Sequence, residues 1–128
     1  MKLKNYYSYS ENNYDQYPLY LFDQRYADNT DMVDDYKILE YWDEDLFKVV
    51  GEEDRPPYRW ILIGTPRTGT PFHTDPRATS AWNALITGKK RWWLFPPNQI
   101  PPGVQDDRDS EYYESPEPIK WYMQYYAS

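Results

Sequence analysis

The chain has 128 residues, no Cys, and 14 Lys and Arg against 21 Asp and Glu, which gives a formal net charge of −7. The length fits one small domain, the absence of Cys excludes disulfides and thiolate metal sites, and the acidic balance argues against a nucleic-acid surface, which needs a basic footprint. No stretch is apolar enough to span a membrane, so we expect an intracellular, soluble protein whose acidic surface serves solubility or a basic protein partner.

The N-terminal residues show little sign of regular structure. Residues 1–16 are rich in Tyr, Asn, Ser and Asp and have no period of 2 or 3.6, which predicts a disordered lead-in. The domain is expected over residues 17–128. Its first element is a short strand over residues 19–22, closed by Asp23.

Short helices are expected after this strand. Asp31 is a candidate N-cap for the first of them, and Asp43 for a second over residues 44–50. Gly51 stands where that second helix would end. Residues 52–57 then form a charged loop that holds two prolines.

From Tyr58 onward, aromatic and β-branched residues predict strands. These strands are expected over residues 58–64, 72–75, 80–86 and 90–95. The last two would form a hairpin that turns at Thr87–Gly88. A long acidic loop over residues 98–118 precedes a final amphipathic segment over residues 119–126. Short helices followed by closely spaced strands favour a mainly β sandwich or barrel with an N-terminal helical cover.

His73 is the only histidine in the chain and stands two residues before Asp75. In a strand this spacing places both side chains on one face. An imidazole beside a carboxylate supplies two ligands of the 2-His-1-carboxylate triad that binds iron(II). The spacing alone is more often a surface pair or a hydrogen-bonded histidine. The Thr70 hydroxyl would join this face only if Pro71 introduces a bulge or kink.

The expected hairpin adds a possible anion site. It places Asn83 diagonally across from Lys90, on a face that also carries Trp92 and Leu94. A lysine among inward-facing apolar residues needs an anionic partner, and a dicarboxylate co-substrate would be one. The alternative is that Lys90 extends its ammonium to solvent.

The run over residues 55–97 resembles a known family. It reads RPPYRWILIGTPRTGTPFHTDPRATSAWNALITGKKRWWLFPP and joins an Arg-Pro turn, Gly-Thr before the histidine, His-x-Asp-Pro, Thr-Ser-Ala-Trp-Asn and Gly-x-Lys-Arg-Trp. In this order and spacing it resembles the JmjC domain of the arginine-demethylase and lysyl-hydroxylase type. A weaker resemblance extends over residues 17–128.

The resemblance implies a double-stranded β-helix, the jelly roll of cupin and JmjC proteins, and an iron(II)- and 2-oxoglutarate-dependent dioxygenase. His73 and Asp75 match its first iron ligands. The residues that match its 2-oxoglutarate site or lie near it are Thr70, Asn83, Lys90 and Tyr20. The implied reaction hydroxylates lysine in splicing-related proteins or demethylates methyl-arginine in histones, in the nucleus, so a Lys/Arg-rich protein substrate is expected.

The sequence also departs from that family. Pro71 and Ala78 stand where the family tends to have glycine. The family's second histidine ligand and its C-terminal strands lie beyond the residue that matches Ser128, so we expect a truncated chain that is inactive, or nearly so, by itself. Two alternatives remain open: a non-catalytic JmjC-like binding module, or a β-structured interaction domain whose motifs are vestigial.

Overall fold

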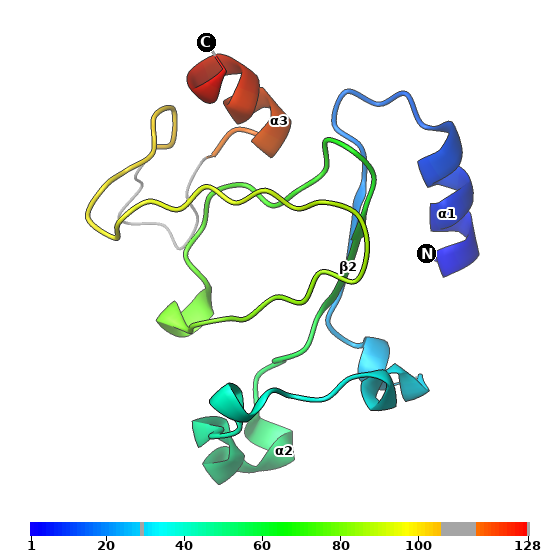
Figure 1. Ribbon diagram of the computed structural model, residues 1–128, viewed down its shortest axis with the longest axis vertical. Helices are drawn as coiled ribbons and strands as arrows, with labels where there is room; N and C mark the ends of the chain where they lie inside the picture. Colours follow the sequence, from blue (N-terminus) through cyan, green and yellow to red (C-terminus); the bar gives the residue numbers. More distant parts are fainter. Residues whose placement is uncertain (29, 106–114, 128) are drawn as a thin grey trace. The chain divides into compact units, whose positions relative to one another are not determined.

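The computed structural model describes residues 1–28, 30–105 and 115–127 (Figure 1). These residues form two compact units. The first unit comprises Met1–Tyr14 and Leu19–Thr65, and the second comprises Asp15–Pro18 and Pro66–Ser128. Among the helices of the described residues, none has the length and apolar character needed to cross a membrane.

The first unit is built on a two-stranded antiparallel sheet. Strand β1 (Tyr20–Asp23) pairs with β2 (Ile61–Gly64), and the register places Leu21 opposite Ile63. Both strands were predicted and both are confirmed: β1 lies one residue later than the expected 19–22, and β2 is shorter than the expected 58–64. Their aromatic and β-branched residues suit a pleated surface.

Helix α1 (Leu3–Asn12) lies where the sequence predicted a disordered lead-in, so that prediction is wrong for these ten residues. Tyrosine side chains of the helix are the cause: the Leu19 amide donates a 2.9 Å hydrogen bond to the Tyr9 hydroxyl, and Tyr6 is the buried residue of the helix. Tyr6 is 1% exposed, and its hydroxyl lies 3.0 Å from the Leu19 carbonyl oxygen and 2.8 Å from that of Ile63. A buried tyrosine combines a large apolar ring with a polar tip, and here it ties a polar helix to the sheet without a helical pattern.

Five short helices connect β1 to β2: η1 (Tyr26–Asp28), η2 (Asp31–Asp35), η3 (Glu40–Trp42), η4 (Leu46–Val50) and α2 (Gly51–Asp54). Two of these helices, η2 and η4, were predicted, but their N-caps differ from the expected Asp31 and Asp43. Helices η1 and η3 were not predicted, and α2 lies where a charged loop over residues 52–57 was expected. Thr30 caps η2, and Asp45 caps η4 by accepting a 3.1 Å hydrogen bond from the Phe47 amide. Gly51, with φ 75°, ends η4 as predicted.

The core of the second unit is aromatic. Helix α3 (Pro118–Trp121) continues into the π-helix η6 (Tyr122–Tyr126) (Figure 1), so the amphipathic segment expected over residues 119–126 is helical. Trp121 is 3% exposed, and its indole N–H donates a 2.7 Å hydrogen bond to the Pro102 carbonyl oxygen. The rings that pack around it belong to Phe72, Phe95, Trp93, Tyr125 and Tyr126.

Three predicted strands of this unit, over residues 72–75, 80–86 and 90–95, are not strands in the part of the chain that the structure describes. The predicted turn is present, because Gly88 has φ 87° and the chain reverses there (Figure 1). A strand exists only where its backbone groups pair with a neighbour. Side-chain pattern indicates an extended chain but does not supply that partner. The predicted loop over residues 98–118 lies partly outside the described residues.

Candidate functional site

His73 and Asp75 lie together just before the short helix η5 (Pro76–Ala78). His73 Nε2 is 3.1 Å from Asp75 Oδ1, and His73 Nδ1 is 2.7 Å from the Pro71 carbonyl oxygen. A carbonyl oxygen can only accept a hydrogen bond, so the Pro71 contact assigns the ring proton to Nδ1. Nε2 faces the carboxylate, and a proton on Nε2 or a cation can occupy that contact. Both side chains are accessible, at 49% and 39% exposure.

This pair fits two ligands of a divalent metal. Two lone pairs 3.1 Å apart repel each other unless a proton or a cation lies between them. A metal with nitrogen and oxygen ligands about 2.1 Å away, at a right angle, holds those two atoms about 3.0 Å apart. The second ring nitrogen bonded to a carbonyl is also the usual arrangement of a metal-binding histidine. Among the described residues, no group of three His, Cys, Asp or Glu side chains could hold a metal.

The same-face placement was predicted from a strand, and the structure achieves it without one. Asp75 has extended backbone angles, φ −60° and ψ 144°, and Pro76 then begins η5. Extended backbone at Asp75, without a strand partner in the described residues, is sufficient to bring the Asp75 carboxylate beside the His73 imidazole. The Pro71 carbonyl oxygen that fixes the imidazole is a backbone atom, so this contact does not depend on proline standing where the family tends to have glycine.

The segment before His73 is held by residues that sequence reasoning did not identify. The Phe72 amide donates a 3.2 Å hydrogen bond to Ser115 Oγ, and the Phe72 ring lies 4.8 Å from that of Trp121. A Cβ atom on Gly69 would come within 3.2 Å of the Pro118 side chain. No spacing rule connects residues 43 positions apart, and only the aromatic composition hinted at such packing.

The residues predicted to bind 2-oxoglutarate are not brought together as His73 and Asp75 are. Thr70, Asn83 and Lys90 are all exposed, and the predicted pairing of Asn83 with the Lys90 strand is not formed. Lys90 does share a face with Trp92, since its Nζ lies 4.5 Å from the ring centroid. Burial around the ammonium lowers the pKa of Lys90. Tyr20 belongs to the first unit, where it begins β1 and is half-buried.

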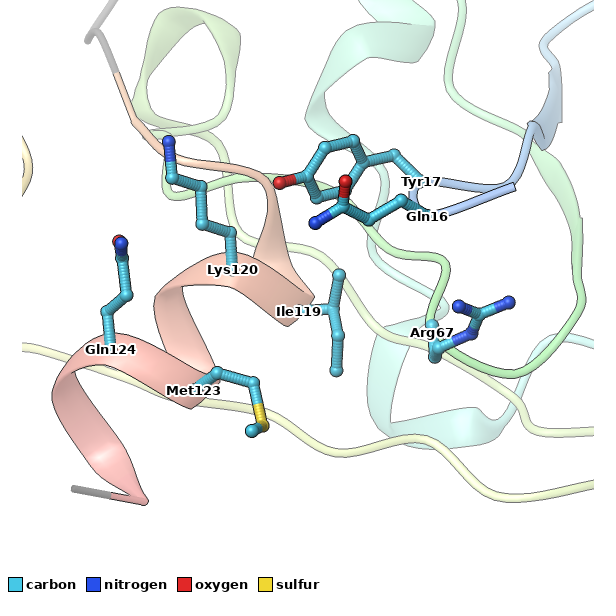
Figure 2. Close-up of a pocket in the computed structure, with 7 residues that line it drawn as sticks. All are labelled: Gln16, Tyr17, Arg67, Ile119, Lys120, Met123 and Gln124. Atoms are coloured by element: carbon cyan, nitrogen blue, oxygen red, sulfur yellow. The ribbon is translucent and has the colours of Figure 1, made fainter. Parts of the chain in front are cut away.

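A hollow of about 320 Å³ lies elsewhere in the second unit (Figure 2). Figure 2 shows side chains of the α3–η6 helix on one side and Gln16 and Tyr17 reaching toward them from the facing segment. Its lining residues are Gln16, Tyr17, Arg67, Ile119, Lys120, Met123 and Gln124. None of them is a predicted site residue, and none offers the imidazole or carboxylate that an iron(II) site needs.

The chain belongs to the cupin-like domain family, whose model matches residues 1–117. It is 48% identical to the arginine-specific demethylase JMJ22 of Arabidopsis thaliana, over 98% of this chain and 25% of that protein. It is 46% identical to the bifunctional arginine demethylase and lysyl-hydroxylase psr-1 of Caenorhabditis briggsae, over 77% of this chain and 25% of that protein. The predicted family resemblance is therefore confirmed.

A third relative is the 2-oxoglutarate and iron-dependent oxygenase JMJD4 of Gallus gallus, which is 38% identical over 47% of this chain and 12% of its own length. The chain thus spans a quarter or less of these three relatives. No solved structure matches the chain significantly. A cupin-like domain implies a jelly-roll β fold, which agrees with the predicted fold class. The described residues themselves show one two-stranded sheet and short helices.

Proposed function

We propose that this chain supplies the iron(II)- and 2-oxoglutarate-binding part of a dioxygenase that acts on protein side chains, either hydroxylating lysine or demethylating methyl-arginine. The observation that carries the proposal is the His73–Asp75 pair, with Nε2 and Oδ1 3.1 Å apart and the ring fixed at Nδ1. The names of the relatives support it, since they include an arginine demethylase, a lysyl-hydroxylase and an oxygenase dependent on iron and 2-oxoglutarate.

Each site residue has a distinct role in this proposal. His73 Nε2 and Asp75 Oδ1 hold the metal, and the Pro71 carbonyl keeps the imidazole turned toward it. Iron(II), when bound with its co-substrate, supplies the activation of oxygen. The Lys90 ammonium binds the distal carboxylate of 2-oxoglutarate. Its Nζ lies over the Trp92 ring and has no ion-pair partner among the described residues.

The remaining assignments follow from the family resemblance. Thr70 and Asn83 would bond 2-oxoglutarate beside Lys90, and Tyr20 would lie near the same pocket. A net charge of −7 suits a Lys/Arg-rich substrate such as a histone or a splicing-related protein. A nuclear location belongs to this proposal as well.

The first test is metal binding at His73, which can be followed through the NMR signals of its own imidazole ring. Because His73 is the only histidine, its imidazole gives a single set of ring signals in NMR spectra. We expect cobalt(II), a stand-in that does not oxidise readily, to shift or broaden these signals. His73→Ala and Asp75→Ala should each weaken cobalt binding by at least about tenfold.

Asp54→Ala is the matched control for this test, because it removes one carboxylate from α2 in the other unit. It should leave cobalt affinity unchanged. Equal affinity in the native chain and in His73→Ala would overturn the proposed metal site.

A non-catalytic binding module is the second candidate. It is favoured by one observation: the described residues contain no third metal ligand near the pair. Such a module would bind the co-substrate without consuming it. Calorimetric binding of 2-oxoglutarate by the longest available form of the protein, together with no release of succinate, would favour this candidate over the enzyme.

A further inference from the structure

One peptide group joins His73 to the C-terminal part of the second unit. The peptide between Pro71 and Phe72 has its carbonyl oxygen 2.7 Å from His73 Nδ1 and its N–H bonded to Ser115 Oγ at 3.2 Å. A peptide group is planar, so the orientation of its N–H fixes the orientation of its C=O. Ser115 therefore acts on the imidazole through a single rigid plane.

The ring of Phe72 is fixed by the same part of the chain. It packs edge-on against Trp121 at 4.8 Å and against Phe95 at 5.5 Å between centroids. Trp121 is itself fixed, because it is 3% exposed and bonds the Pro102 carbonyl through its indole N–H. Phe72 is half-buried while the neighbouring His73 is exposed. Rotating the peptide plane would therefore pull an aromatic ring out of its packing.

We propose that Ser115 and Trp121 are positioning residues for the metal-binding pair: together they orient the Pro71–Phe72 peptide, which holds the proton on His73 Nδ1 and leaves Nε2 free for the metal. This inference rests on the proposed function, since it assigns the metal to His73 and Asp75. Neither residue touches the metal, and both act through the peptide. The Gly69 contact with Pro118 supports the same connection, since it brings the start of α3 against the turn before Thr70.

The test uses the tautomer of His73 as its readout. In the metal-free chain, nitrogen-15 shifts of the single imidazole should show a proton on Nδ1. Ser115→Ala removes the acceptor of the Phe72 amide, and Trp121→Leu removes the ring that packs on Phe72. We expect both variants to lose the Nδ1 preference and to bind cobalt(II) about tenfold more weakly.

Two matched variants separate positioning from general stability. Trp121→Phe keeps a ring against Phe72 and should restore the tautomer. Tyr126→Leu removes a ring from the same cluster, one that packs on Trp93, Trp121 and Tyr122 rather than on Phe72, and should leave the tautomer unchanged. A merely structural role would make Tyr126→Leu and Trp121→Leu behave alike, which would overturn the proposal.

The other possible results of these experiments also test the positioning role of Ser115 and Trp121. If Ser115→Ala and Trp121→Leu both fold and keep the Nδ1 tautomer, the inference is wrong. If Trp121→Leu does not fold, Ser115→Ala decides, because it deletes one hydroxyl only. If the native chain binds no cobalt at His73 but the tautomer still depends on Ser115 and Trp121, then the proposed function fails and the positioning role holds.

Discussion

Arg55 connects three parts of the first unit through one side chain. Its guanidinium lies 3.4 Å from the centroid of the Tyr58 ring and donates a hydrogen bond to the Asp45 carboxylate, which caps η4. The Arg55 side chain is 7% exposed. A cation removed from water needs a carboxylate beside it. The sequence indicated a charged loop over residues 52–57, but pairing across ten residues follows no period, so this contact could not be predicted.

This pair gives the first unit a defined response to acid. The hydrogen bond from Arg55 holds the pKa of Asp45 below its usual 3.8. The folded state thus binds fewer protons than the unfolded state just below that pH, and stability falls as pH drops through the lowered pKa. Asp45→Asn should be less stable at neutral pH and should lose less stability on acidification, as measured by chemical unfolding from about pH 7 to pH 2.

Asp43→Asn is the matched substitution for this experiment, since it makes the same change two residues away and on a side chain that does not pair with Arg55. It should keep the acid dependence of the native chain. Equal acid dependence in Asp45→Asn and in the native chain would show that the Arg55 pair does not control this response.

At the scale of elements, a turn, a helix end and two strands could be predicted from residue type, but the pairing of strands in the second unit could not. The turn at Gly88, the end of η4 at Gly51 and the two strands of the first unit follow from residue type and position. Residues 80–86 and 90–95 have the composition of strands, yet they run without a ladder in the described part of the chain. Which strand lies beside another depends on long-range contacts, and side-chain alternation does not encode them.

The missing ladder over the predicted hairpin has a measurable consequence. In the 128-residue chain, the amides of residues 83–86 and 90–95 should exchange with solvent faster than the ladder amides of β1 and β2, because these residues lie outside any strand ladder of the described part of the chain. Hydrogen exchange followed by NMR or mass spectrometry measures this difference. Equal protection of both regions in the 128-residue chain would contradict the absence of a ladder.

For the whole molecule, the order of the sequence motifs identified the family better than the expected fold geometry did. His-x-Asp at residues 73–75 was a weak signal by itself, and the surrounding motifs made the family recognisable before any contact was known. The contacts then added what the motifs did not contain: the proton on Nδ1, the Ser115 bond and the Trp121 packing. Co-substrate residues were the least resolved, because Thr70, Asn83 and Lys90 come from segments that lack strand partners.

Catalysis is a property of the whole molecule, because it needs a set of metal ligands that this chain does not supply in full. A facial triad takes two histidines and one carboxylate, and the sequence has one histidine. With iron(II), 2-oxoglutarate and oxygen, the 128-residue chain should therefore release succinate at the rate of free iron. His73→Ala is the control and should leave succinate release at that background. Turnover by the 128-residue chain that His73→Ala abolishes would show instead that two protein ligands suffice.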